Sequence, residues 1–413
     1  MKKMDTTPFD TRKVPPKQNL FFMPFIWVAC WVLTRSGKLK LHKVNMKGLK
    51  PPYLVLGTHH AFMDFYVTPL ALFPHRANYV SELEGFEAYG EWLYRQAGCL
   101  GTRKFINDIN LVRNIKRVME RKGILVLYPE ARYANVGTSS QLPESIGKLV
   151  KLLGVPLVTL NMKGNYLQSP IWNLEKRSGV LLVATLTKVI SAEEVEKASV
   201  EEINALIEKY LSYDEYAYQA DNHIKITYKD RCKGLEMPLY QCRECGMEFS
   251  MTGEGSKLRC DNCKAVWEMD ELGRLIKEDK QYHIPDWYEW ERSQVIQQIR
   301  EGKYDLNCNV RIEALPNAKN FLPCGQGTLL HKKDGFYLTF TDYGEAEEKT
   351  LFFSSKSLFS IHTEYDYRGK FGQCITLSTI NNTYFIYPLD EGFNATKIQF
   401  ATEYLHKLEE KKA

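Results

Sequence analysis

The chain has 413 residues, of which 44% are hydrophobic and 25% are charged, and its formal net charge is +5. This length exceeds what one ordinary hydrophobic core supports, so two or three domains are expected. The composition is that of a globular protein and excludes a disordered or fibrous chain. The small positive charge permits binding to anionic surfaces without requiring nucleic acid.

Residues 1–48 are predicted to associate with a membrane surface. Residues 20–33 (LFFMPFIWVACWVL) are almost wholly apolar, but this run is too short to cross a hydrocarbon core, which needs about 20 residues. Basic residues stand on both sides of the run, a pattern typical of a helix lying in the interface of an anionic bilayer. The alternative interpretation is a buried core helix.

Residues 49–220 are predicted to form an α/β domain, because apolar strand-like segments alternate with helix-like segments. The strands are apolar enough to be covered on both faces, as in a sheet flanked by helices. The expected strands are 53–56, 77–81, 99–102, 124–128, 155–160 and 180–186, and the expected helices are 61–73, 82–97, 107–121, 145–153 and one or two helices within 191–220.

The next stretch, residues 221–300, is predicted to contain a zinc ribbon and a linker. Two Cys-x-x-Cys pairs occur there, and two such pairs about 15 residues apart can converge tetrahedrally on zinc. Four thiolates leave no open coordination position, so the metal is expected to be structural. This stretch carries more acidic than basic residues, which argues against nucleic acid as a partner. The four expected ligands are Cys242, Cys245, Cys260 and Cys263.

Residues 301–413 are predicted to form a small β-rich domain that ends in a helix. Short strands capped by a single final helix are the order found in pleckstrin-homology-like barrels, which is an analogy of pattern only. The expected strands are 328–332, 336–341, 350–353, 358–362, 374–378 and 383–387, and the final helix has Ile398, Ala401, Leu405 and Leu408 on one face.

The motif that carries chemistry is residues 57–64, Gly-Thr-His-His-Ala-Phe-Met-Asp, directly after the first apolar strand. An aspartate that holds one imidazole nitrogen fixes the tautomer and leaves the other nitrogen as a general base. On a continuous helix His59 and Asp64 would lie about 140° apart, so they can meet only if His59 precedes the helix. His60 and Asp64 would instead share a face if the helix began at His60. We favour His59, because Gly57-Thr58 supplies a turn after the strand.

Three further blocks follow in order: residues 101–104 (GTRK), 127–132 (LYPEAR) and 154–158 (GVPLV). With these four blocks, residues 20–220 resemble the lysophospholipid acyltransferase family, whose best-known members acylate 1-acylglycerol 3-phosphate. The resemblance implies an acyltransferase-type sheet, with His59 as the base and Asp64 as its orienting partner. Arg103 and Lys104, with Arg132, would bind the acceptor's phosphate, and Glu130 would shape the pocket beside the pair.

The chain departs from the family pattern at several positions. Thr58 stands where Asn is usual, Ala61 where Ser is usual and Ala131 where Gly is usual. The arginine of the third block comes one position early, at Arg132, and Tyr133 takes its usual place. These changes leave the chemistry plausible and bear on the identity of the acceptor.

The function expected from this sequence is transfer of a fatty acyl group from a thioester, acyl-CoA or acyl carrier protein, to the hydroxyl of a lysophospholipid. The expected acceptor is 1-acylglycerol 3-phosphate, and the expected place is the cytoplasmic face of a membrane with anionic lipid, bound peripherally or monotopically. The scattered single cysteines suit a reducing compartment. The alternative from another class is a non-catalytic, membrane-associated zinc-ribbon scaffold or adaptor.

Overall fold

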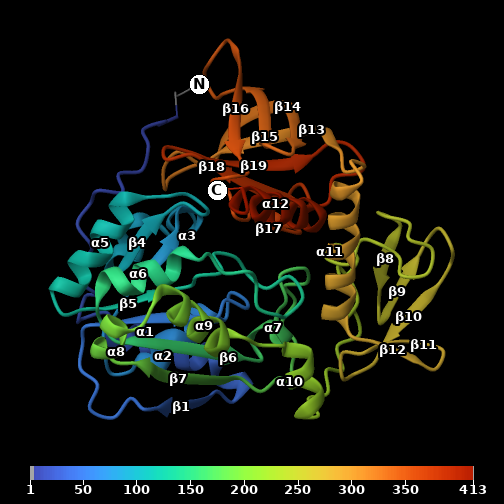
Figure 1. Ribbon diagram of the computed structural model, residues 1–413. Coiled ribbons are helices and arrows are strands. Elements are labelled where there is room, and N and C mark those ends of the chain that lie inside the picture. The colour runs from blue at the N-terminus through green and yellow to red at the C-terminus, as the bar shows by residue number, and fades with distance from the viewer. Residues whose placement is uncertain (1–3, 413) are drawn as a thin grey trace.

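The computed structural model describes residues 4–412 and shows a mixed α/β protein with three separate β-sheets. In Figure 1 the first sheet and its helices lie at one end of the molecule and the third sheet lies at the other, with the small second sheet to one side. Helix α11 (Ile284–Arg300) stands beside the second sheet, and helix α12 (Ala395–Glu410) lies under the third sheet, toward the first.

The first sheet has seven strands in the order β1-β7-β6-β2-β5-β3-β4. Its pairs are parallel except β6–β7, which is antiparallel. Strand β2 is buried along its whole length, as expected for a central strand covered by helices on both faces. The strands are β1 (Lys40–Val44), β2 (Tyr53–Gly57), β3 (Asn78–Glu82), β4 (Cys99–Thr102), β5 (Ile124–Leu127), β6 (Leu157–Lys163) and β7 (Val183–Ile190).

Four helices of this part, α5, α8, α9 and α10, begin at a polar residue whose side chain caps the first turn. Asp108 caps α5 by accepting from the N–H of Asn110, and Ser191 and Ser199 each form a capping box, which satisfies the free N–H groups of a first turn. The helices are α1 (Met23–Thr34), α2 (Asp64–Leu72), α3 (Leu83–Tyr89), α4 (Glu91–Gln96), α5 (Ile109–Glu120), α6 (Ser145–Leu153), α7 (Asn165–Gln168), α8 (Ala192–Lys197), α9 (Val200–Leu211) and α10 (Glu215–Asp221).

Helix α1 has one buried face and one exposed apolar face. Met23, Cys30 and Thr34 are buried and follow helical spacing, and the helix packs against α2. On the opposite side Phe25 is 63% exposed and Trp31 is 59% exposed. Within residues 4–412, no helix is both long enough and apolar enough to cross a membrane.

The second sheet is antiparallel, with the order β12-β11-β10-β9-β8. It packs against α11 through aromatic side chains, with the rings of Trp267 and Trp287 4.9 Å apart. The indole N–H of Trp287 also donates to the carbonyl of Gln241 at 2.9 Å. The strands are β8 (Met251–Glu254), β9 (Lys257–Cys260), β10 (Val266–Met269), β11 (Leu275–Lys277) and β12 (Lys280–Tyr282).

The third sheet has seven antiparallel strands in the order β16-β15-β14-β13-β19-β18-β17, and α12 follows it. Strand β13 alternates buried and exposed residues, as expected for a sheet with one face on a core. The strands are β13 (Leu306–Ala314), β14 (Leu322–Lys332), β15 (Gly335–Thr341), β16 (Glu348–Ser354), β17 (His362–Glu364), β18 (Cys374–Ser378) and β19 (Thr383–Pro388).

The structure confirms the mixed α/β class and most of the predicted elements, and several elements differ. The strand expected at 358–362 is wrong, because β17 begins only at His362, and the strand expected at 180–186 begins at Val183. Strands β1 and β13 and helix α11 were not predicted. β1 could not be predicted from its own residues, because they are exposed and basic. Its strand conformation depends on its pairing with β7.

Candidate active site and metal centre

The predicted site residues lie where strands of the first sheet end. His59 follows β2, Arg103 follows β4 and Glu130 follows β5. Because β2, β3, β4 and β5 run parallel, their carboxyl ends meet at the same edge of the sheet. Ligands of open α/β sheets bind at this edge, so the topology collects the sequence blocks in one place.

His59 and Asp64 form a hydrogen-bonded pair at this edge. The His59 Nδ1 lies 3.1 Å from Asp64 Oδ2, and helix α2 begins only at Asp64, so His59 precedes the helix. The same carboxylate oxygen accepts from the backbone N–H groups of His60 and Ala61 at 2.6 and 3.2 Å, and Asn165 Nδ2 donates to the other oxygen at 2.6 Å. Four donors hold this fully buried carboxylate and fix the orientation of the imidazole.

His60, the other candidate base, points away from this pair. Its ring lies 3.9 Å from the ring of Tyr213, and its Nδ1 lies 3.6 Å from Glu215 Oε1. Burial lowers the pKa of His60 to about 4 and raises the pKa of Glu215 to about 8. His60 is therefore neutral at pH 7, and only its backbone N–H contributes to the Asp64 site.

Aromatic rings hold the imidazole of His59 from two sides. The ring of Tyr128 stacks on it at 4.5 Å and the ring of Tyr133 lies 4.6 Å away. The approach of Tyr128 requires a glycine at position 57, since a Cβ there would lie 2.8 Å from the Tyr128 ring. Gly57 of the first block therefore provides the space in which this stacked ring fits.

Glu130 holds the backbone of His59 and does not line the cavity that His59 faces. Its Oε1 accepts from the His59 N–H at 3.1 Å, and its Oε2 accepts from the Ser140 N–H at 2.9 Å and from the Tyr213 hydroxyl at 3.1 Å. Burial raises the pKa of Glu130 above its ordinary value. The resemblance placed Glu130 beside the pair, and the structure shows it there as a support behind His59.

His59 lines a cavity of about 520 Å³ between the end of the first sheet, α5, α6 and the loop before β17. This volume lies within the range of small-molecule sites, roughly 300–1,000 Å³. Among residues 4–412 no hydrogen-bond partner of His59 Nε2 is found, so this nitrogen is available to a ligand. The apolar lining is supplied mainly by Phe105, Ile109, Val112, Ile115, Leu127, Ile146, Leu149 and Phe359.

Arg103 lines the cavity, but the C-terminal region occupies most of its guanidinium. Its Nη2 donates to the carbonyls of Pro316 at 2.6 Å and Asn381 at 2.9 Å, and its Nη1 donates to the carbonyl of Ile380 at 3.0 Å. Burial lowers the pKa of Arg103 to about 10. These three bonds leave two of its five N–H groups for another acceptor, one on Nη1 and the one on Nε, which is buried without a partner.

Lys104 lies in a buried polar cluster on the cavity wall. Its Nζ pairs with Glu82 at the end of β3 and lies 3.0 Å from His362 Nε2. Burial alone would lower the pKa of Lys104, but Glu82 and Glu84 outweigh it and raise the pKa. Burial also raises the pKa of Glu364, beside His362, to about 8. The lysine charge is thus already balanced by a carboxylate.

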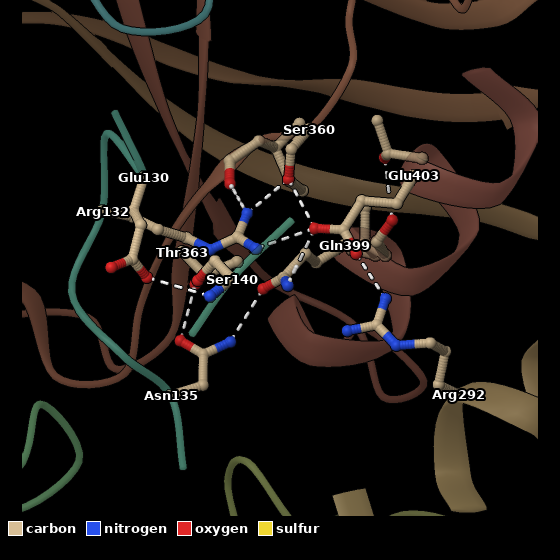
Figure 2. Close-up of polar contacts among 12 residues, drawn as sticks. Glu130, Arg132, Asn135, Ser140, Arg292, Ser360, Thr363, Gln399 and Glu403 are labelled. Carbon is tan, nitrogen blue, oxygen red and sulfur yellow. Dashed lines mark hydrogen bonds and ion pairs between the residues drawn. The ribbon is translucent and has the colours of Figure 1, made fainter. Parts of the chain in front are cut away.

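Arg132 does not belong to the cavity wall. Its Nη2 donates to Glu403 Oε1 at 2.8 Å, and its Nη1 donates to Ser360 Oγ and to the carbonyl of Ile361 at 3.1 Å (Figure 2). The side chain is 2% exposed. Phosphate binding by Arg132, which the resemblance implied, finds no support in this geometry.

The four predicted cysteines form a close cluster at one end of the second sheet. Their Sγ atoms all lie within 4.8 Å of one another, with 3.7 Å between Cys242 and Cys263 and 3.8 Å between Cys245 and Cys260. Four Zn–S bonds of about 2.3 Å in a tetrahedron place sulfur atoms about 3.8 Å apart. The donor set and its spacing therefore fit a zinc ion.

Several residues of this site were not predicted from the sequence. Asn165 bonds Asp64 across 101 positions of sequence, and Tyr213 bonds Glu130 across 83. Asn165 directly follows β6, so the rule that parallel strands end at one edge could have indicated it. Tyr213, in a loop after α9, gives no comparable signal.

Comparisons with known proteins add little to this picture. No protein-family model and no curated sequence matches the chain. Among solved structures the chain is similar to the 1-acyl-sn-glycerophosphate (LPA) acyltransferase PlsC from Thermotoga maritima, with 12% identity and a TM-score of 0.39. The match covers 46% of this chain and 77% of that chain. The inference of function therefore depends on the geometry of the site.

Proposed function

We propose that the protein is an acyltransferase that moves a fatty acyl group from a thioester to the hydroxyl of a lysophospholipid. The observation that carries the proposal is the His59–Asp64 pair on the wall of a largely apolar cavity. An oriented imidazole is the group that a hydroxyl nucleophile needs, and an apolar cavity suits an acyl chain. The contact between His59 and Asp64 and the cavity beside them are features of the structure and add to the sequence resemblance.

The reaction follows from the tautomer that Asp64 holds. With the proton on Nδ1, Nε2 of His59 takes the proton of the acceptor hydroxyl while its oxygen attacks the thioester carbonyl. The C–S bond then breaks, and the thiolate leaving group recovers a proton from the imidazolium. A positioned base of this kind contributes about 10²–10⁴ in rate, and no covalent enzyme intermediate is required.

For the acceptor we propose a lysophospholipid of the 1-acylglycerol 3-phosphate type. Arg103 and Lys104 are the cationic residues on the cavity wall. Both are largely paired by the surrounding protein, so the phosphate would compete with carbonyls and with Glu82. Acyl-CoA and acyl carrier protein are both candidate donors.

We further propose that α1 holds the protein on the cytoplasmic face of an anionic membrane. The outward apolar side chains of α1 include Phe25 at 63% exposure, with Phe21 exposed just before the helix, and Arg35 stands at the end of the helix beside Trp31. An apolar helix face flanked by cations is the arrangement of an interfacial helix. The exposure of this face argues against the alternative of a buried core helix.

For the other two regions we propose supporting roles. The four cysteines would hold one structural zinc ion, since four thiolates leave no open position for catalysis. We propose that the third sheet, in which β13 lies between β14 and β19, forms a pleckstrin-homology-like barrel with the final helix. That assignment is an analogy of topology and implies no ligand.

The test of the proposed function is product analysis by mass spectrometry. Purified full-length protein is mixed with acyl-CoA or acyl carrier protein and with a panel of lysophospholipids that differ in headgroup. We expect a diacyl product from at least one pair, with the matched His59→Ala protein giving none above background. No product from any pair would support the non-catalytic scaffold instead.

A further inference from the structure

Residues 130–135, in the segment between β5 and α6, have two faces, and one of them contacts His59. On one face Glu130 accepts from the His59 N–H at 3.1 Å, and the Ala134 N–H donates to the His59 carbonyl at 3.1 Å. The ring of Tyr133 lies 4.6 Å from the imidazole. This segment, called the cradle below, therefore contacts the backbone and the ring of the proposed base.

The other face of the cradle is fixed to the C-terminal region. Arg132 donates to Glu403 Oε1 at 2.8 Å, and Asn135 Nδ2 donates to Gln399 Oε1 at 2.7 Å (Figure 2). Glu403 and Gln399 lie on α12, one helical turn apart. Along the cradle, residues that contact His59 therefore alternate with residues that contact α12.

Glu403 is the centre of this second face. Its carboxylate also accepts from Arg292 on α11, from Ser360 Oγ at 2.7 Å and from Gln399 Nε2 at 3.0 Å. It is 2% exposed, and breaking a buried pair leaves an uncompensated charge, which is strongly unfavourable. The cluster therefore holds Arg132, and with it the cradle, in one arrangement.

We propose that Glu403 is a positioning residue for the reaction, which sets the place of His59 through Arg132 and the cradle. The inference rests on the proposed function and deepens it by giving the C-terminal helix a role in catalysis. It also accounts for the early position of the arginine in the third block. Arg132 faces α12, and Tyr133, which stands at the usual arginine position, faces His59. A small displacement of a positioned group can cost about 10²-fold in rate.

The test uses full-length Glu403→Gln protein with its zinc content verified. We expect kcat to fall by about tenfold or more while KM for the acyl donor stays near that of the wild type, since the cavity is untouched. Hydrogen–deuterium exchange should rise in peptides that cover residues 128–136 and 57–62, with little change in α5 or α9. Glu409→Gln, which changes a partly exposed carboxylate on the same helix paired with Lys412, is the matched control and should behave as wild type.

Two results would overturn the inference. The first is a wild-type kcat in Glu403→Gln. The second is a kcat that falls only as far as the amount of folded protein falls, with hydrogen–deuterium exchange in the cradle unchanged. If Glu403→Gln does not fold, Asn135→Ala replaces it, because it removes the second contact to α12 without leaving a charge unpaired. The exchange measurement separates this inference from the proposed function. An inactive wild type would refute the acyltransferase, whereas the exchange of residues 57–62 would still show whether α12 positions His59.

Discussion

The His59–Asp64 pair and the Arg132–Glu403–Arg292 cluster are both buried and both held by several hydrogen bonds, but they are assembled over different distances in the sequence. His59 and Asp64 are 5 positions apart, whereas Arg132 and Glu403 are 271 apart. The first faces the cavity and leaves Nε2 available; in the second, Arg132 and Glu403 are each 2% exposed and their polar groups are taken up by one another and by neighbouring side chains. A local constellation involves one region of the chain, while a long-range cluster joins distant regions and affects both their folding and their relative geometry.

The proposed zinc centre is the local constellation with the largest expected effect. Purified protein should contain close to one zinc per chain, and Cys242→Ser or Cys260→Ser should lower that content and unfold the second sheet. Structural zinc binding contributes about 10–16 kcal/mol in zinc-finger peptides. The measurement is metal analysis together with circular dichroism, with Cys324→Ser in the third sheet as the control. Full zinc content in a protein that carries both Cys242→Ser and Cys260→Ser would refute the metal centre.

Substitution of His59 or Asp64 should lower the activity of the protein without lowering its stability. We expect His59→Ala to lower turnover by about 10²-fold or more, as for a lost general base, and Asp64→Asn to give a comparable loss. His60→Ala should be milder, because its ring packs against Tyr213 and only its backbone serves Asp64. Turnover and melting temperature of each variant are compared with exposed His42→Ala. An inactive His60→Ala beside an active His59→Ala would reverse the assignment.

The exposed apolar side chains of α1, together with Phe21 just before it, should control membrane binding and contribute little to the fold. Replacing Phe21, Phe25 and Trp31 by Ser removes three exposed apolar side chains, each worth about 1.5–3 kcal/mol when fully buried. We expect binding to anionic vesicles to weaken by at least about tenfold, and wild-type binding to weaken with salt. Phe352→Ser, which changes an aromatic side chain on β16 that is 51% exposed, should bind as wild type. Undiminished binding of the triple variant would place the anchor elsewhere.

The long-range cluster should make stability depend on pH. Burial alone would raise the pKa of Glu403, but Arg292 and Arg132 outweigh it and lower it from 4.5 to about 2. A depressed carboxyl pKa stabilises the fold above its unfolded value, so this contribution is complete above about pH 4.5 and is lost as pH falls toward 2. Its size is about 3 kcal/mol.

Denaturant unfolding of wild type and Glu403→Gln at several pH values measures this contribution. The difference in free energy of unfolding should be largest at pH 7 and should shrink below pH 4.5. Glu409→Gln serves again as the control on the same helix. A difference that stays constant from pH 7 to pH 3 would show that the ion pairs do not carry the stability of the cluster.

The sequence predicts the local constellations and not the long-range ones, for a physical reason. Gly57 and Thr58 indicate a turn before His59, and the two Cys-x-x-Cys pairs carry their geometry in their spacing. An arginine that binds phosphate and an arginine that pairs with a distant glutamate look alike in sequence. The partner of Arg132 is on the last helix, and no period or motif connects the two. The proposed roles of the site residues stay predictions.

The smallest expected effect tests the cradle itself, which lies between the two regions. Ala131 adopts a φ of 55°, in the left-handed region that disfavours a side chain by about 1–2 kcal/mol, and glycine is usual here in the family that the chain resembles. Glycine also loses more entropy on folding, so Ala131→Gly should stabilise the protein by about 1 kcal/mol or less, seen as a higher denaturant midpoint. Ala134, in the same cradle, has no positive φ, so Ala134→Gly should instead destabilise the protein. Equal losses in both variants would show that residue 131 is not strained and that α12 imposes no backbone cost on the cradle.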